Sequence, residues 1–321
     1  MHRLSGIRNM SQTYCSQHSI TLEKMPKRIE LFSKAALSRG QGLKAVLKAA
    51  KENKDAIPQL SMQLNNIKPD RLKVRQYAKV CSFNFDVHAL PLTYPHILAF
   101  NLHIKLMTHP LFPLPIMGLI HVRNTITSDR AMFIDELVNI QVFICSSRLT
   151  KKGLEFDIHS EVIINTQVVW QSISTYLYLI KKNPASTEAS NTSPLKQHET
   201  QSPFRYQQQW SLPENLGRKY AQVSGDANPI HLHKLSAKLF GFKQAIAHGM
   251  WLKAHSIAVL KPIFKSQYPI TISVDFKQPT PLNSDIKMHY QETKKLNNSI
   301  NFDLRNPDGN KLHMTGCITY F

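Results

Sequence analysis

The sequence predicts an α+β protein built from two similar halves. Each half shows an apolar segment of helical length followed by four strand-like segments. Between the halves, residues 181–203 contain almost nothing to bury, which is typical of a solvated linker. A long helix followed by antiparallel strands indicates a sheet that wraps the helix. We therefore expect two copies of one fold, packed against each other as a pseudo-dimer within the chain.

The composition is that of a folded, strongly basic chain. Hydrophobic residues make up 42% of the 321 residues, and no apolar run reaches the ~20 residues of a membrane-spanning helix, so we expect a soluble, cytoplasmic protein. The four scattered cysteines show no metal-ligand spacing. The net charge of +19 should attract phosphate-bearing carriers, acidic proteins, anionic membranes or nucleic acid. Nucleic acid is not expected as a partner, because no zinc spacing or aromatic single-strand pattern accompanies the charge.

Residues 1–70 are predicted to be a basic, partly helical N-terminal extension. The first 25 or so residues are polar and acid-poor, which predicts a disordered tail, with a transit peptide as the alternative. Residues 27–54 carry many lysines and arginines among apolar residues at approximately helical spacing. We interpret them as a helix with a solvated basic face, and a helix that binds a membrane surface or an acidic partner is the alternative.

Residues 71–180 are predicted to form the first half. The alternation of Val80, Phe83, Phe85 and Val87 indicates a strand. Residues 92–107 then predict an apolar helix that begins near Pro95, because proline is favourable in a first helical turn. Four predicted strands follow: Met117–Val122, Leu137–Cys145, Phe156–Ile164 and Val168–Leu179.

Residues 204–321 are predicted to form the second half, in the same order. An apolar helix is expected from about His248 to Leu260. The sequence Asn306-Pro-Asp-Gly309 predicts a hairpin turn between the last two strands. The four predicted strands are Ile270–Phe276, Ile286–Gln291, Ser299–Leu304 and Leu312–Tyr320.

The chemistry is concentrated in the run Tyr220-Ala-Gln-Val-Ser-Gly-Asp-Ala-Asn-Pro-Ile-His-Leu-His233, just before the second helix. Gly225 and Pro229 punctuate this run, which predicts a bent loop. Such a loop can direct the Asp226 carboxylate and the His231 imidazole, with Asn228 between them, into one small volume. Adding water to a conjugated double bond needs one group that takes a proton from water and one that delivers a proton to carbon. The sequence therefore predicts acid–base chemistry at this loop.

Gly249 follows His248 at the start of the second helix. The first N–H groups of a helix are free donors at the positive end of its dipole, and glycine allows a ligand to approach the backbone closely. A carbonyl oxygen that gains charge in an enolate-like transition state would be stabilised by such a donor. The alternative for Gly249 is a structural role, in a close contact between helices or in a flexible loop. The other histidines have no spacing that converges on a metal and are interpreted as surface or structural residues, and the tryptophans are interpreted as core: His233, His255, His289, His313, Trp170, Trp210 and Trp251.

These residues carry a resemblance. Tyr220–His231 resembles the hydratase motif of the MaoC-like family of R-specific enoyl thioester hydratases and 3-hydroxyacyl dehydratases, and Ala247-His-Gly-Met250 resembles the start of that family's central helix. The resemblance covers roughly residues 203–321, while the upstream half is similar to the motif-free first half of two-repeat members. It implies a double hot-dog fold, in which each repeat is a long central helix wrapped by an antiparallel sheet.

The resemblance also implies the roles of the site residues. Asp226 and His231 would be the catalytic acid–base pair, Asn228 would position water and substrate, and the Gly249 N–H would bind the thioester oxygen. No metal and no other cofactor is implied. The first repeat lacks the motif and should be catalytically silent, contributing the wall of an acyl tunnel.

The function implied is reversible hydration of trans-2-enoyl thioesters to (3R)-hydroxyacyl thioesters in fatty acid metabolism. The acyl group would be carried by coenzyme A or by acyl carrier protein. Two alternatives remain, a non-catalytic acyl-binding module and a hot-dog thioesterase. The sequence leaves open the acyl chain length, the carrier, the physiological direction, and whether the pseudo-dimer pairs into a homodimer.

Overall fold

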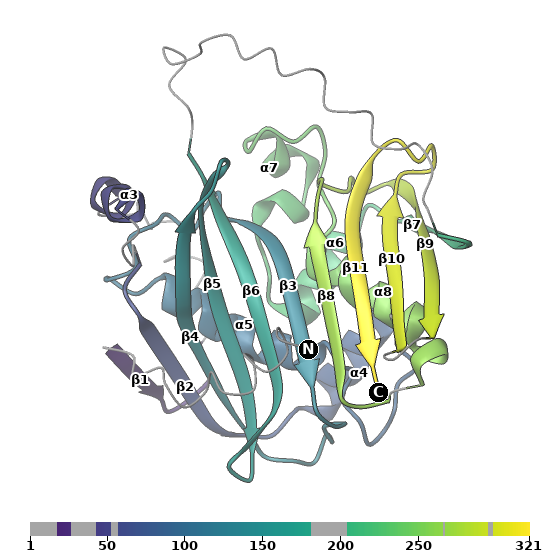
Figure 1. The fold of residues 1–321 in the computed structure, drawn as a ribbon, viewed down its shortest axis with the longest axis horizontal. Helices are drawn as coiled ribbons and strands as arrows, with labels where there is room; N and C mark the ends of the chain where they lie inside the picture. The colour runs from purple at the N-terminus through teal and green to yellow at the C-terminus, as the bar shows by residue number, and fades with distance from the viewer. Residues whose placement is uncertain (1–17, 27–42, 53–56, 181–203, 266, 295–297) are drawn as a thin grey trace.

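The computed structural model describes residues 18–26, 43–52, 57–180, 204–265, 267–294 and 298–321. In this part of the chain one eleven-stranded sheet curves around two long helices, α5 (Tyr94–Met107) and α8 (Gly249–Phe264), which lie behind the sheet in Figure 1. Both helices are apolar on nearly all sides and are largely buried, as expected for helices enclosed by a sheet. Pro95 stands in the first turn of α5, and the prediction of that helix is confirmed.

The two halves repeat one order of elements. The first half contains β2 (Leu60–Ile67), α4 (Arg71–Val80), α5, β3 (Ile120–Ser128), β4 (Val138–Leu149), β5 (Gly153–Ile164) and β6 (Gln167–Leu179). The second contains β7 (Tyr206–Leu212), α6 (Leu216–Ser224), α8, β8 (Ile270–Phe276), β9 (Ser284–Lys294), β10 (Asn298–Arg305) and β11 (Leu312–Tyr320). The strand order β1-β2-β4-β5-β6-β3-β8-β11-β10-β9-β7 is symmetric about the junction of β3 and β8 once β1 is set aside. The α+β fold class and the double hot-dog arrangement are confirmed.

Strands β3 and β8 join the halves as an antiparallel pair. Their register places Arg123 opposite Asp275 at one end and Ser128 opposite Ile270 at the other. A second link connects the helices, since the Trp251 indole N–H on α8 donates a hydrogen bond to the Val80 carbonyl at the end of α4 (2.9 Å). One continuous hydrophobic core runs through both halves. Each half therefore buries apolar side chains of the other.

The structure corrects several predicted elements. The expected strand at residues 80–87 is wrong, because Val80 ends helix α4 and a loop follows. This helix begins after the N-cap Asp70 and buries Val74, Tyr77 and Ala78 on one face. Their helical spacing lies upstream of residues 80–87, so the short alternation at 80–87 alone did not reveal the helix. The first predicted strand, Met117–Val122, instead runs from Ile120 to Ser128.

Three strands and three short helices were not predicted: β1 (His18–Leu22), β2, β7, α4, α6 and α7 (Lys234–Lys238). Strand β2 precedes the expected start of the first half at residue 71, yet it pairs with β4 in the sheet. Strand β7 is a mostly exposed, glutamine-rich strand at the end of the sheet, so its sequence carries little of the alternation that marks a half-buried strand.

The N-terminal extension contributes β1 (His18–Leu22), which pairs in parallel with β2, and α3 (Leu43–Lys51). The expected disordered tail is therefore wrong for residues 18–22, which add a strand to the sheet. Val46 and Ala50 on α3 are buried while Lys48 is exposed, so this helix rests on the body of the protein with a basic outer face. The rest of the expected basic helix, the first 17 residues and the expected linker at 181–203 lie outside the described residues. Among the described helices, none is both long and apolar enough to cross a lipid bilayer.

Candidate active site

The motif run folds into the bent loop that the sequence predicts. Helix α6 ends at Ser224, and Gly225 reverses the chain in the left-handed region (φ 84°), where glycine carries no steric cost. Asp226 to Asn228 are non-helical, and Pro229–His231 form one turn of 3-10 helix, η3. The loop then continues through a short helix, α7 (Lys234–Lys238), to the start of α8 (Figure 1).

Gly217 seats this loop on its own helix. A Cβ atom at Gly217 would lie 1.8 Å from the carbonyl oxygen of His231, so the backbone of η3 rests directly on the first turn of α6. No other residue type permits this approach. The contact fixes the position of the His231 backbone on α6, and so helps to set where its side chain lies relative to Asp226.

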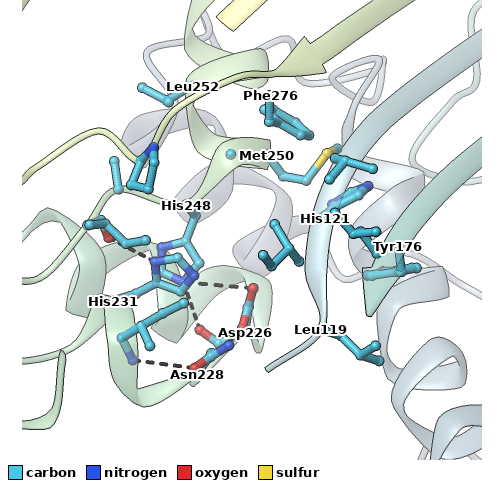
Figure 2. A pocket seen from close by; sticks show the side chains of 18 of the residues that line it. Leu119, His121, Tyr176, Asp226, Asn228, His231, His248, Met250, Leu252 and Phe276 are labelled. Atoms are coloured by element: carbon cyan, nitrogen blue, oxygen red, sulfur yellow. Dashed lines mark hydrogen bonds and ion pairs between the residues drawn. The ribbon is translucent and has the colours of Figure 1, made fainter. Parts of the chain in front are cut away.

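Asp226, His231 and His248 converge at the cavity, as Figure 2 shows. One carboxylate oxygen of Asp226 and one ring nitrogen of each histidine lie within 4.8 Å of one another. The two imidazoles stack, with ring centroids 3.8 Å apart. The His248 Nε2 lies 3.9 Å from Asp226 Oδ2. The structure thus brings Asp226 and His231 together as expected and adds His248, which the sequence analysis treated only as part of the helix start.

Hydrogen bonds to backbone carbonyls decide which ring nitrogens carry protons. His231 Nδ1 lies 2.8 Å from the Ile246 oxygen, and a carbonyl only accepts, so Nδ1 is protonated and Nε2 keeps a lone pair. His248 Nε2 lies 3.0 Å from the Asp226 backbone oxygen, so His248 donates there and its Nδ1 holds the lone pair. His231 therefore presents a base, whereas His248 holds the backbone of Asp226.

Burial shifts both groups of the pair. Removal from water raises the pKa of the Asp226 carboxyl, and the facing His231 and the N–H of Asn228 oppose this rise. Burial also lowers the pKa of His231, opposed by the Asp226 charge and the bond to Ile246. The pKa of His248 falls well below its usual value through burial, and the neighbouring His231 adds to this fall. Both imidazoles are thus neutral near pH 7, which suits His231 to accept a proton.

Asn228 has a structural role that the sequence did not reveal. Its side-chain oxygen accepts a hydrogen bond from the Ile230 N–H (3.3 Å) and caps η3, as asparagine commonly does at helix starts. Its own N–H donates to Asp226 Oδ1 (3.2 Å) and orients the carboxylate. Asn228 also lines the cavity, so its amide nitrogen is left to meet water or substrate.

Gly249 opens α8 directly after the N-cap His248. Its N–H is one of the first four of the helix, which have no partner within it. A Cβ at this position would lie 2.9 Å from the Phe276 ring. The residue type is therefore required by close packing against Phe276, in addition to any approach of a ligand.

A cavity of about 410 Å³ reaches these residues from between the two halves. The second half contributes the motif residues, Gly249, Phe276 and Phe242. The first half contributes the opposite wall, with His121 on β3 and Tyr176 on β6 facing the motif residues in Figure 2. Most of the remaining lining is apolar: Ile97, Phe100, Ile104, Met107, Leu119, Leu177 and Leu252. The volume and the apolar lining of the cavity suit a ligand with a hydrocarbon chain.

The same three residues could hold a metal ion, since each offers one ligand atom within 4.8 Å of the others. The donor set of two imidazoles and a carboxylate suits zinc. His248 Nε2, however, already donates to the Asp226 carbonyl, so ligation through that nitrogen would need a change of tautomer and the loss of this bond. The geometry fits an acid–base pair with a supporting histidine without rearrangement.

Comparison with known proteins agrees with this geometry. The sequence profile described as MaoC like domain matches residues 195–307, which include the whole motif. The chain thus contains a MaoC-like domain in its second half. It is 28% identical over 288 residues to 3-hydroxyacyl-thioester dehydratase X of Mycobacterium tuberculosis, covering 88% of this chain and 99% of that protein. The crystal structure of that protein, HtdX, matches 81% of this chain with a TM-score of 0.68.

Other MaoC-like structures share the fold at lower identity. The dehydratase from Phytophthora capsici matches 83% of this chain and 96% of its own at a TM-score of 0.63 and 16% identity. A shorter relationship links the chain to the mitochondrial 3-hydroxyacyl-[acyl-carrier-protein] dehydratase of Arabidopsis thaliana, 29% identical over 69 residues, or 22% of this chain and 42% of that protein. The structural similarity to HtdX extends over both halves, covering 81% of this chain and 99% of that chain.

The histidines and tryptophans outside the motif have varied positions. His255 stacks on Trp251, and His289 lies 3.0 Å from Asp303, both structural contacts as expected, and Trp170 and Trp251 are buried in the core. His313 is different, because it lines the cavity. No spacing in the sequence identifies it, or Tyr176 and His121, since these residues reach the cavity only through the pairing of strands distant in sequence.

Proposed function

We propose that this MaoC-like protein catalyses reversible addition of water to trans-2-enoyl thioesters, giving (3R)-hydroxyacyl thioesters. The observation that carries the proposal is the placement of Asp226 and a neutral His231, with its Nε2 lone pair, at a cavity that also receives the start of α8. The relationship to 3-hydroxyacyl-thioester dehydratase X supports the same reaction class. The (3R) configuration is part of the proposal and rests on the motif.

The reaction would proceed between the two walls of the cavity. A water molecule held by Asp226, Asn228 and His231 gives a proton to His231 Nε2 while its oxygen bonds to C3 of the enoyl group. Charge moves to the thioester oxygen, which the Gly249 N–H stabilises at the positive end of α8. The Asp226–His231 pair then returns a proton to C2, so water is added and the pair regains its starting state. Dehydration is the same path in reverse.

The test uses two variants and one control, with crotonyl-CoA and longer enoyl-CoA as substrates. Asp226→Asn and His231→Gln should lower kcat by about 10²–10⁴-fold, the range typical of general acid–base groups, with circular dichroism unchanged. Asp308→Asn, in the exposed turn between β10 and β11, should behave as the wild type. Near-normal turnover by both site variants would overturn the proposal.

The other two functions are separated by simple measurements. A thioesterase would release free thiol from acyl-CoA, which a colorimetric thiol assay detects, and we expect no release above background. A non-catalytic acyl-binding module would bind enoyl-CoA without consuming it. The intact pair and the tautomer of His231 favour catalysis over both.

For the carrier, we propose an acidic protein, acyl carrier protein, in addition to coenzyme A. Lys152 and Lys277 are exposed and line the cavity, which places them at its opening. Helix α7 adds Lys234 and Lys238 beside leucines that are 77% and 85% exposed, Leu235 and Leu239. No acidic residue occurs between Asp226 and Asp275. Lys152 and Lys277 at the cavity, together with the basic and apolar surface of α7, would complement an acidic carrier surface.

Charge reversal tests the carrier. Lys234→Glu/Lys238→Glu should raise KM for acyl carrier protein substrates at low salt more than KM for coenzyme A substrates, and added salt should reduce the difference. Lys73→Glu/Lys79→Glu, on the exposed face of α4, is the matched control. Equal KM for all three proteins would exclude this surface.

The cytoplasmic location of the protein stays a prediction. Imaging of the tagged full chain in cells would test it.

A further inference from the structure

The half without the motif supplies the wall that faces Asp226, and this wall is not purely apolar. His121 on β3 and Tyr176 on β6 lie across the cavity from Asp226 and His231 in Figure 2. Tyr176 is only 6% exposed, so its hydroxyl is removed from bulk water. An apolar side chain would line an acyl channel at lower cost, because a buried hydroxyl must find a partner. The hydroxyl therefore calls for a functional explanation.

Neighbouring rings hold the phenol in one orientation. The Tyr176 ring stacks on His121 with centroids 4.8 Å apart and an angle of 20°. Phe156 packs on it at 5.5 Å and 24°. A side chain confined in this way loses little further freedom when it binds an oxygen, which is the condition for effective stabilisation of a transition state.

A buried histidine positions the hydroxyl. Tyr176 Oη lies 3.2 Å from His103 Nδ1, and His103 Nε2 lies 2.6 Å from Ser160 Oγ. His103 is fully buried on α5, and burial, aided by His121, lowers the pKa of His103 to about 3, so it stays neutral. A phenol can donate one hydrogen bond and accept two. When His103 Nδ1 carries the proton, it donates to Tyr176 Oη, and Ser160 Oγ donates to His103 Nε2. In this arrangement the one hydrogen of the phenol remains available for an oxygen in the cavity.

The hydroxyl also lies within electrostatic reach of the catalytic carboxylate. Burial raises the pKa of Tyr176 well above its usual value, the charge of Asp226 raises it further, and a hydrogen bond with the Ser174 side chain opposes the rise. The phenol therefore keeps its proton at neutral pH. It is a neutral donor on the wall opposite the motif.

We propose that Tyr176 is a catalytic residue supplied by the silent repeat. Its hydroxyl binds the oxygen that is added to, or removed from, C3, from the side opposite Asp226, and His103 is the positioning residue that orients it. This inference rests on the proposed hydratase function. It assigns to the first half a direct part in the reaction, beyond forming the tunnel wall.

Tyr176→Phe removes one oxygen atom and is the main test. We expect kcat for hydration of crotonyl-CoA and a longer enoyl-CoA to fall about 10–100-fold, between the loss of an ordinary hydrogen bond and that of an oxyanion donor. KM should change by less than about threefold, because a bond made mainly in the transition state affects kcat. The matched control is Tyr178→Phe, on the same strand but outside the cavity lining, which should leave both constants unchanged.

His103→Asn tests the positioning role. Alone it should lower kcat by about tenfold, and in the Tyr176→Phe background it should have no further effect on kcat, because the hydroxyl it orients is gone. A purely structural His103 would lower kcat equally in both backgrounds. That result would overturn its assignment.

The outcomes separate this inference from the function on which it rests. Wild-type kcat for Tyr176→Phe, or an effect on KM alone, combined with an inactive Asp226→Asn, would overturn the role of Tyr176 and leave the hydratase proposal standing. Full activity of Asp226→Asn and His231→Gln would overturn the function itself.

Discussion

The two repeats place the same elements around the same kind of central helix, and they differ most in one connection. In the first repeat α4 leads through residues 81–93 into α5. In the second, α6 leads through residues 225–248 into α8, and this longer connection holds η3, α7, Asp226 and His231. The residues of the motif are therefore carried by one longer connection, while the strands and the central helices correspond between the repeats. The sheet and the helices hold both ends of the loop, which is how rigid scaffolds commonly position functional loops.

A second difference lies at the start of the short helices. Leu72 stands two residues after the cap Asp70 of α4 and is 70% exposed. Gly217 stands two residues after the cap Asn215 of α6 and lies under the His231 carbonyl. Leu72 is largely exposed, so a large side chain is tolerated at this position in the first repeat. In the second repeat the His231 turn occupies the space that a side chain at position 217 would need.

Gly217→Ala, in the repeat that carries the motif, should have the largest effect on activity. The added methyl would displace the His231 turn, and a shift of about 1 Å at a site can cost about 100-fold in rate. Overpacking should also lower the free energy of unfolding by about 1–3 kcal/mol. Steady-state kinetics and urea unfolding measure both. The equivalent Leu72→Ala should change the free energy of unfolding by no more than about 0.5 kcal/mol, and wild-type activity of Gly217→Ala would contradict the seating role.

The junction of the repeats can be tested through a buried lysine. Lys253 on α8 is fully buried, and its Nζ donates to Asn124 Oδ1 (2.5 Å) and to the Ile272 carbonyl (3.0 Å). Lys253→Met and Asn124→Leu should each cost about 1–3 kcal/mol of unfolding free energy, because each leaves buried partners unsatisfied.

The double variant sharpens this comparison. It should cost less than the sum of the two single variants, with a coupling of about 0.5–3 kcal/mol. Thr125→Val is the control. It removes the side-chain hydrogen bond between Thr125 and Ser273 across the same strand pair, and it should lower the free energy of unfolding less than either substitution at Lys253 or Asn124. Additive costs would show that Lys253 and Asn124 act independently.

Asn228 can be separated into its two roles by two substitutions. Asn228→Ala loses the cap of η3 and should lower the free energy of unfolding by about 1 kcal/mol. Asn228→Ser retains a capping oxygen and should restore stability, yet kcat should stay about tenfold low because the amide nitrogen at the cavity is gone. Thermal unfolding and kinetics on the same samples decide between the roles. Full activity of the serine variant would limit Asn228 to capping.

Asp226→Asn should raise stability while removing activity. Asp has a pKa of about 3.9 in an unfolded chain, and burial raises it in the folded protein. The native state is therefore favoured most below the unfolded value, and this advantage is lost as pH rises through the folded pKa. At neutral pH the asparagine variant should melt at a higher temperature than the wild type, and the difference should vanish in acid. A lower melting temperature at neutral pH would contradict this sign.

The sequence predicted the repeated order of elements because the patterns that encode it are local. Strands β8 and β11 match their predicted bounds, and α5 begins as its proline indicates. The same reasoning failed for residues 80–87, where a few alternating apolar residues lie in a helix end and loop. It also failed for β7, whose polar residues follow from its place at the sheet edge. Alternation of apolar and polar residues predicts a strand only where one face of the strand is buried.

The sequence by itself determined the fold class, the bent loop and the proximity of Asp226 and His231, since glycine, proline and spacing act within a few residues. Only the tertiary structure decided what meets that pair. His248 joins it through α8, Gly217 supports it from α6, and Tyr176 faces it from the other repeat. These contacts depend on strand pairing and helix packing between distant segments, and single side chains leave no periodic trace of them in the chain.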